Sequence, residues 1–177
     1  MDEPLSPSAR PRISSRSLFW LTIGVAVAAL AVDLFTKAWA LANLTEKESV
    51  PLVGNFIRLQ LIHNPGAAFS LGEGVTWIFT LLSAGVLVLI LWYARTVTSV
   101  PLAIILGFLA GGAAGNLWDR LTRPPGFARG HVVDFIDYNG WFIGNVADIW
   151  IVGAVIALVI LRLVEKDPAS GEGGRRG

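Results

Sequence analysis

The chain contains no cysteine and only two histidines among its 177 residues. The absence of cysteine excludes disulfide bonds, thiolate nucleophiles and cysteine-ligated metal sites. His63 and His131 alone are too few for a histidine-rich metal site, so we expect neither a metal nor another cofactor. The net charge is only +1, and nothing in the sequence supports nucleic-acid binding.

Hydrophobic residues, in contrast, make up 54% of the chain and gather in long blocks. A transmembrane helix needs about 20 mostly apolar residues to cross a hydrocarbon core of about 30 Å. Four blocks reach this length, so we predict an all-α membrane protein with a single membrane domain over residues 18–165. The predicted spans are Leu18–Ala42, Val75–Ala94, Val100–Trp118 and Val146–Val164.

The segments outside this domain are 1–17 and 166–177, and both are rich in proline, serine, glycine and charge. We expect both tails to be disordered. Basic residues lie before the first span, between the second and third, and after the fourth, which predicts cytoplasmic termini. Segments 43–74 and 119–145 then lie outside. β-Branched and aromatic residues over 50–63 predict a small extracytoplasmic β element of one or two strands there.

The first span also has features of a cleavable secretory signal, because basic residues and an apolar run precede Ala40-Leu41-Ala42. Asp33 and Lys37 make the run too polar for that alternative, and we favour a retained helix. These two residues are four apart and therefore share one helix face, where they can pair. The pair is either a structural one that reaches toward the interface or a support for a neighbouring site.

The predicted third helix combines packing residues with polar ones. Gly107, Gly111 and Gly115 recur every four residues, which favours close approach of another helix. Polar residues follow near the outer end of the same helix: Asn116, Asp119 and Arg120. An arginine there can hold a carboxylate by two parallel hydrogen bonds, so we interpret this group as support for a site.

Two aspartates are the strongest candidates for chemistry. Asp134 lies between apolar residues in VVDFIDY, and Asp148 lies at the start of the fourth predicted helix, where Asn145 is a candidate cap. Two neighbouring carboxylates share a proton over a useful pH range, as in aspartic peptidases. Each is also explicable alone, Asp134 as a loop carboxylate and Asp148 as a helix-start acid.

Other chemistries have less support in the sequence. A Ser–Lys pair could combine Ser70 with Lys37, and Ser83 lies in the second span, but no motif surrounds these serines. A Ser–His scheme lacks a positioned serine. The main alternative is a small proton-coupled transporter, because intramembrane acids paired with a base also serve transport. Transport sites usually lie near the midplane, whereas these polar groups gather at the outer ends of the predicted helices.

Five sequence blocks resemble those of the bacterial lipoprotein signal peptidases (signal peptidase II), and they occur in that family's order. The blocks are VDLFTK (32–37), HNPGAAFS (63–70), GGAAGNLWDR (111–120), VVDF (132–135) and NVAD (145–148). The ordered set is far more specific than any single block.

The resemblance implies a membrane aspartic peptidase with Asp134 and Asp148 as its catalytic dyad. It implies a prolipoprotein substrate that carries diacylglyceryl-cysteine and is cut on the amino side of that cysteine, with membrane lipids as partners and globomycin as an inhibitor. It also implies the bacterial cytoplasmic membrane, with the site at the outer face. The implied substrate-binding or supporting residues are Asp33, Lys37, Asn64, Gly66, Asn116, Asp119, Arg120, Asn145 and Ala147.

Two features depart from the family's pattern. Gly144 precedes Asn145 where the family usually has phenylalanine, so we expect looser packing at the start of the fourth helix. Segment Leu121–Arg129 looks longer than in many relatives, and its Pro-Pro-Gly sequence favours a turn. We therefore expect an enlarged loop beside the site.

Overall fold

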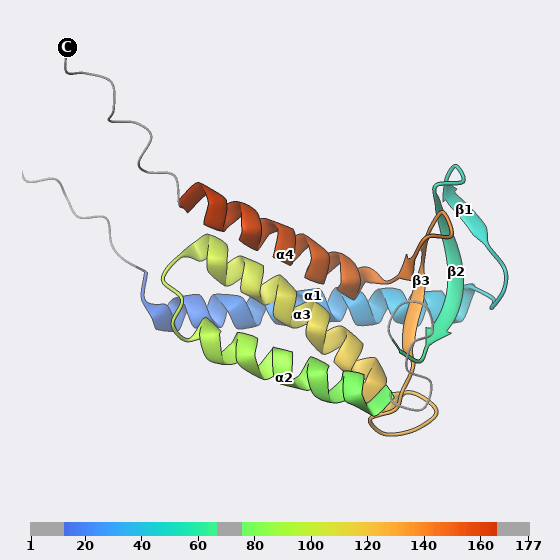
Figure 1. Ribbon diagram of the computed structural model, residues 1–177, viewed down its shortest axis with the longest axis horizontal. Helices are drawn as coiled ribbons and strands as arrows, with labels where there is room; N and C mark the ends of the chain where they lie inside the picture. Colours follow the sequence, from blue (N-terminus) through green and yellow to red (C-terminus); the bar gives the residue numbers. More distant parts are fainter. Residues whose placement is uncertain (1–12, 67–75, 166–177) are drawn as a thin grey trace, which may run out of the picture.

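The computed structural model describes residues 13–66 and 76–165, which form four long helices and a small sheet at one end of them (Figure 1). Each helix is long and apolar enough to cross a membrane, which confirms the four predicted spans. The helices are α1 (Ser15–Asn43), α2 (Thr76–Ala94), α3 (Val100–Thr122) and α4 (Val146–Glu165).

The ends of the helices differ from the predicted spans by more than one residue at two places. Helix α1 begins at Ser15, inside the predicted N-terminal tail, because the Ser14 side chain caps it by accepting a hydrogen bond from the Ser17 backbone N–H at 3.2 Å. Helix α3 continues to Thr122 rather than ending at Trp118. The rest of both predicted disordered tails, 1–12 and 166–177, lies outside the described residues.

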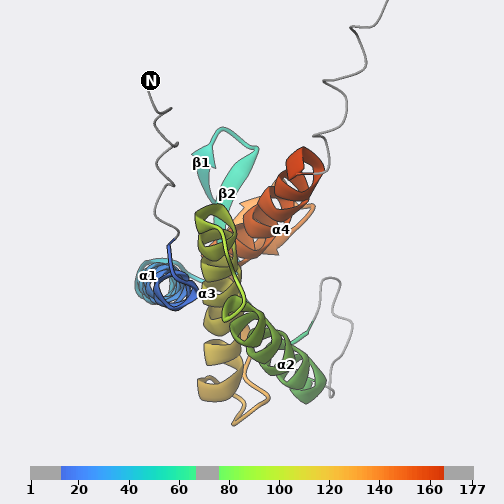
Figure 2. The same cartoon turned by 90° about the vertical axis from the view of Figure 1, so that its left-hand side faces the viewer.

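Helix α3 is the centre of the membrane domain and packs against the other three helices (Figure 2). Its small residues make this possible on two faces. A Cβ atom at Gly111 would lie 2.6 Å from Ala29 Cβ in α1, and one at Gly112 would lie 2.6 Å from the Ala147 carbonyl oxygen in α4. Both distances are far below van der Waals contact, so the glycines permit the close helix approach that their spacing predicted.

The sheet has four antiparallel strands in the order β1-β2-β3-β4. Strands β1 (Val50–Val53) and β2 (Ile57–Asn64) confirm the predicted β element. Strands β3 (Val132–Tyr138) and β4 (Ile143–Gly144) were not predicted from the sequence. Strand β3 is the most buried of them and pairs with β2 along its length. Asp134 therefore lies on a central strand, not in a loop as its plainer interpretation required.

The four-residue connection 139–142 joins β3 to β4 and contains a tight turn at Asn139-Gly140. Asn139 and Gly140 have φ angles of 56° and 78°, the positive values that a tight turn of this kind requires at both central positions. The Asp137 carboxylate accepts from the Gly140 backbone N–H at 2.6 Å and pairs with Arg58 of β2 at 2.7 Å. The hairpin is thus fixed to its neighbouring strand by a buried acid.

The connection from α3 to β3 is the loop expected to be enlarged. It folds back on the helix, because the Gly130 N–H donates to the Arg120 carbonyl oxygen at 2.9 Å. Thr80 of α2 donates its hydroxyl to the Ala128 carbonyl oxygen at 2.8 Å. The loop is therefore anchored to two helices, and it delivers the chain directly into β3.

Gly111→Leu should destabilise the protein, because a branched side chain has no space between α1 and α3. Overpacking of this kind costs about 1–3 kcal/mol, measurable as a lower melting temperature in detergent. Gly24→Leu is the matched control. Gly24 lies on α1, the helix that packs against Gly111, but no atom lies within 4 Å of a Cβ placed at Gly24. Equal effects of the two variants would contradict the packing explanation.

Candidate active site

The first turn of α4 holds Asp148 by a reciprocal cap. The Asn145 side-chain oxygen accepts from the Asp148 backbone N–H at 3.1 Å, and the Asp148 carboxylate accepts from the Asn145 backbone N–H at 3.0 Å. This arrangement is a capping box, which satisfies backbone donors at a helix start. Asp148 is therefore a helix-start acid, as its simpler interpretation required. The cap also fixes the direction of its carboxylate.

Asn145 joins the two aspartates. Its side-chain nitrogen donates to Asp134 Oδ1 at 2.6 Å and to Asn116 Oδ1 at 3.1 Å. Asn116 in turn donates to Asp148 Oδ1 at 2.9 Å. The structure thus brings Asp134 and Asp148 into one hydrogen-bonded group, although they belong to a strand and a helix.

Lys37 determines how Asn116 is oriented. Its ammonium donates to Asn116 Oδ1 at 3.1 Å, on the same oxygen that accepts from Asn145. With two donors on that side, the amide nitrogen of Asn116 must face Asp148. Lys37 therefore acts on the carboxylate of Asp148 through one intervening side chain.

Lys37 itself is completely buried, with 0% of its side chain exposed. It pairs with Asp33 at 2.8 Å and with Asp119 at 2.9 Å. The predicted Asp33–Lys37 pair is confirmed, but it does not reach toward the interface as its structural interpretation required. Asp33 instead accepts from the Ala147 backbone N–H at 2.8 Å, which connects α1 to the start of α4.

Asp119 has several partners of its own. It also pairs with Arg123, and it accepts from the Val133 backbone N–H at 3.2 Å. The carboxylate of Asp119 therefore positions the strand residue that directly precedes Asp134.

Asp134 faces the helices from the middle of β3. Asn64 pairs with Val132 across the sheet, so Asp134 is its diagonal neighbour on the same face. The Asn64 side chain donates to Asp134 Oδ2 at 2.9 Å. Burial and then the nearby Asp148 raise the pKa of Asp134 to about 7, although the amides of Asn64 and Asn145 oppose this shift.

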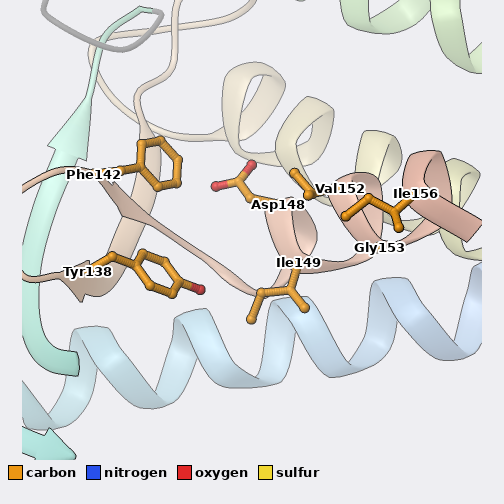
Figure 3. A pocket seen from close by; sticks show the side chains of 7 residues that line it. All are labelled: Tyr138, Phe142, Asp148, Ile149, Val152, Gly153 and Ile156. Carbon is orange, nitrogen blue, oxygen red and sulfur yellow. The ribbon is translucent and has the colours of Figure 1, made fainter. Parts of the chain in front are cut away.

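Two hollows meet at Asp148. The first, called here the polar cavity, has a volume of about 170 Å³ and is lined by Asn64, Gly66, Asn116, Arg120, Val132, Asp134, Phe142 and Asp148. The second, called the apolar groove, has a volume of about 490 Å³ and runs along α4 (Figure 3). Its lining residues are Tyr138, Phe142, Asp148, Ile149, Val152, Gly153 and Ile156.

Arg120 does not hold a carboxylate of the described residues by two parallel hydrogen bonds, although the sequence suggested that it would. One guanidinium nitrogen lies 3.4 Å from the Gly66 carbonyl oxygen. The guanidinium lies over the Phe79 ring, 5.4 Å from its centroid. Its Nη1 atom is buried and has no hydrogen-bond partner in this part of the chain. Arg120 is thus held beside the polar cavity with donor capacity to spare.

All the predicted site residues among those described lie in or directly beside this network. Two lining residues, Tyr138 and Phe142, were missed. The Asn139-Gly140 dipeptide is a hairpin-turn signal, and it would have indicated that the chain reverses here and that the aromatic residues on its two sides lie close together. Ser70, needed for the Ser–Lys alternative, lies outside the described residues. Within 13–66 and 76–165, no group of three or more acidic or histidine side chains is arranged to hold a metal ion.

Lys37→Met should strongly destabilise the protein, because it leaves Asp33 and Asp119 with less compensating charge in a buried position. Removing one partner of a buried ion pair costs about 3–5 kcal/mol, which a melting curve in detergent detects. Addition of Asp33→Asn should recover part of the loss.

The control is Arg162→Met, which breaks the Arg162–Glu165 pair, whose side chains are 52% and 47% exposed. An exposed pair contributes less than about 1 kcal/mol. If Lys37→Met melted no lower than Arg162→Met, the buried network would not be important for stability.

Comparison with known proteins identifies the family. A family model described as signal peptidase (SPase) II matches residues 25–164. The lipoprotein signal peptidase of Rhodococcus jostii is 42% identical over 99% of this chain and 87% of its own length, and that of Mycobacterium avium is 41% identical over 94% and 92%.

Solved structures agree with these sequence matches. A bacterial membrane enzyme structure determined by the in meso method at 1.9 Å resolution has a TM-score of 0.70 and 27% identity, over 80% of this chain and 92% of its own. A second, at 2.3 Å resolution, has a TM-score of 0.73 at 24% identity, covering 88% and 93%, and shows the fold. The comparisons give the transporter alternative no support. The chain belongs to the signal peptidase II family.

Proposed function

We propose that this protein is a membrane aspartic endopeptidase that removes signal peptides from diacylglyceryl-modified prolipoproteins. The observation that carries the proposal is the placement of Asp134 and Asp148 at one polar cavity, joined by Asn145, at the end of the helices that bears the sheet. By the distribution of basic residues this end faces the outside of the bacterial cytoplasmic membrane, and both termini are cytoplasmic. A site there is within reach of a signal peptide that lies in the bilayer.

The two acids have different surroundings and therefore different roles. One oxygen of Asp148 accepts from the Asn116 side-chain amide of α3, and the other accepts from the Asn145 backbone N–H at the start of α4. These contacts hold the carboxylate in a direction from which it can act as the base. The raised pKa of Asp134 keeps this acid protonated up to about pH 7. One base and one acid are thus available to the same substrate carbonyl.

The reaction follows from these states. Asp148 takes a proton from water as the water oxygen attacks the amide carbon, and Asp134 gives its proton to the carbonyl oxygen. The tetrahedral diol then collapses: Asp148 returns its proton to the leaving nitrogen, the C–N bond breaks, and a diol hydroxyl reprotonates Asp134. The products are the free signal peptide carboxyl group and the amino group of the lipidated cysteine.

The remaining features accommodate the substrate. Arg120 and Asn64 both line the polar cavity, where they can donate to the peptide backbone. One guanidinium nitrogen of Arg120 has no hydrogen-bond partner among the described residues and is available for this. The apolar groove on α4 opens beside Asp148 and suits an acyl chain of the diacylglyceryl group. We expect globomycin to inhibit this protein, because the resemblance to the signal peptidase II family implies it.

Asp134→Asn and Asp148→Asn should each abolish cleavage of a purified diacylglyceryl-modified prolipoprotein, because an amide can neither share the proton nor act as the base. Both variants should remain folded in detergent. Asp137→Asn is the matched control, since Asp137 lies on the same strand but pairs with Arg58. A dead Asp137→Asn protein beside an active Asp134→Asn protein would contradict the assignment of the dyad.

Cleavage should fall as the pH rises through about 7, because Asp134 then loses the proton that it supplies to the carbonyl. Asn64→Ala removes an N–H that stabilises the ionised carboxylate, so the alkaline limb of the rate profile should move to higher pH. The folding stability of the protein depends on Asp134 as well. The pKa of Asp134 in the folded protein is higher than its value of about 3.9 in the unfolded chain. The stabilisation that its protonated form contributes at low pH is therefore lost as the pH rises from about 4 to about 7.

The control for this profile is His63→Gln, because an imidazole also titrates near neutral pH. His63 pairs with Glu46 at 2.8 Å, away from the two aspartates. The limb should stay in place in this variant, and a limb that disappeared with His63 would remove Asp134 from the interpretation.

A further inference from the structure

Gly144 leaves a space in this protein that a neighbouring aromatic ring occupies. A Cβ atom at Gly144 would lie 2.5 Å from Phe142 Cε1 and 2.8 Å from Asp148 Oδ2. The Phe142 ring and the Asp148 carboxylate therefore converge on the same point. Any larger residue at position 144 would displace both the ring and the carboxylate, so the position of the ring depends on the glycine.

Phe142 is held in place by the hairpin that carries it. Its ring stacks on Tyr138 with a centroid distance of 6.2 Å and an interplanar angle of 20°. The Tyr138 backbone N–H donates to the Phe142 carbonyl oxygen at 2.8 Å. The tight turn at Asn139-Gly140 closes this pair. Figure 3 shows the Phe142 ring directed toward the Asp148 carboxylate.

The ring also separates the two hollows of the site. Among the described residues, the polar cavity and the apolar groove share Phe142 and Asp148 as lining residues. A substrate amide at Asp148 must therefore extend from one hollow to the other past Phe142. The lipid-bearing side of the scissile bond needs the larger apolar groove, which leaves the polar cavity for the residue on the amino side.

The volume of the polar cavity is restrictive. Its 170 Å³ must hold the reacting carbonyl group and the attacking water, whose share of liquid volume is about 30 Å³. Little space remains for a side chain. We propose that Phe142 is a specificity-determining residue, whose ring limits the size of the substrate side chain immediately before the scissile bond. This inference rests on the proposed peptidase function.

The test compares two diacylglyceryl-modified prolipoproteins that differ only in having Ala or Leu before the lipidated cysteine. The wild-type protein in detergent should cleave the Ala substrate with the higher kcat/KM. Phe142→Ala should narrow the Ala-to-Leu ratio of kcat/KM by about tenfold or more, since differences of this size follow from a few methylene groups in a pocket. Phe142→Leu, which keeps part of the bulk, should give an intermediate ratio and also serves if Phe142→Ala does not fold.

Two further variants separate the ring from its surroundings. Trp141→Ala removes the neighbouring aromatic residue of the same hairpin, which is 85% exposed and lines neither hollow, and it should leave the ratio unchanged. Gly144→Ala should lower kcat on both substrates, because its Cβ displaces the Asp148 carboxylate, and it should also change the ratio in the wild-type background, because its Cβ displaces the ring. The same substitution should leave the ratio unchanged in the Phe142→Ala background.

The outcomes are distinguishable. An unchanged ratio in the Phe142 variants, an equal loss on both substrates, or a wild-type protein without preference for Ala would each overturn the role of Phe142. An effect of Gly144→Ala on the ratio that is independent of Phe142 would overturn it too. Failure of the wild-type protein to cleave either substrate would instead overturn the proposed function.

Discussion

The ammonium group of Lys37 is the interaction on which the rest of the structure depends. A buried charge is tolerated only when its partners replace the hydration that it loses. Lys37 donates a hydrogen bond to Asn116 at 3.1 Å and forms ion pairs with Asp33 at 2.8 Å and Asp119 at 2.9 Å. These partners lie on α1 and α3, and each of them contacts a further element, so one buried cation organises several elements.

The contacts of these three partners position Asp134 and Asp148. Asp33 binds the backbone at the start of α4, and Asp119 binds the backbone of β3. Asn116 directs its amide to Asp148. The strand that carries Asp134 and the helix that carries Asp148 are therefore both attached to one buried charge. The glycines of α3 allow this, because only a close helix approach brings such short side chains together.

The sequence predicted the membrane helices well because their signal is long and depends on composition alone. It also predicted the Asp33–Lys37 pair, since a separation of four residues on a helix leaves little freedom. Strand β3 was missed because it has two aspartates within seven residues, which lowers its apparent strand propensity. Only its pairing with β2 and the partners of Asp137 offset that penalty.

The contacts of Arg120 and Phe142 could not be predicted for a different reason. A sequence indicates that an arginine at a helix end can hold a carboxylate, but the direction of the side chain depends on Phe79 and on the chain near Gly66. The absence of a side chain at Gly144 likewise suggested loose packing. In the structure a residue two positions earlier fills that space, which is a tertiary compensation.

The distribution of the site over the chain has a consequence for biosynthesis. Asp33 and Lys37 enter the membrane with α1, Asn116 with α3, and Asp148 only with α4. A nascent chain with three inserted helices therefore has an Asp33 carboxylate without its α4 partner and an Asn116 amide without Asp148. The polar cavity, which Asp148 lines, is complete only after the step that completes the membrane topology.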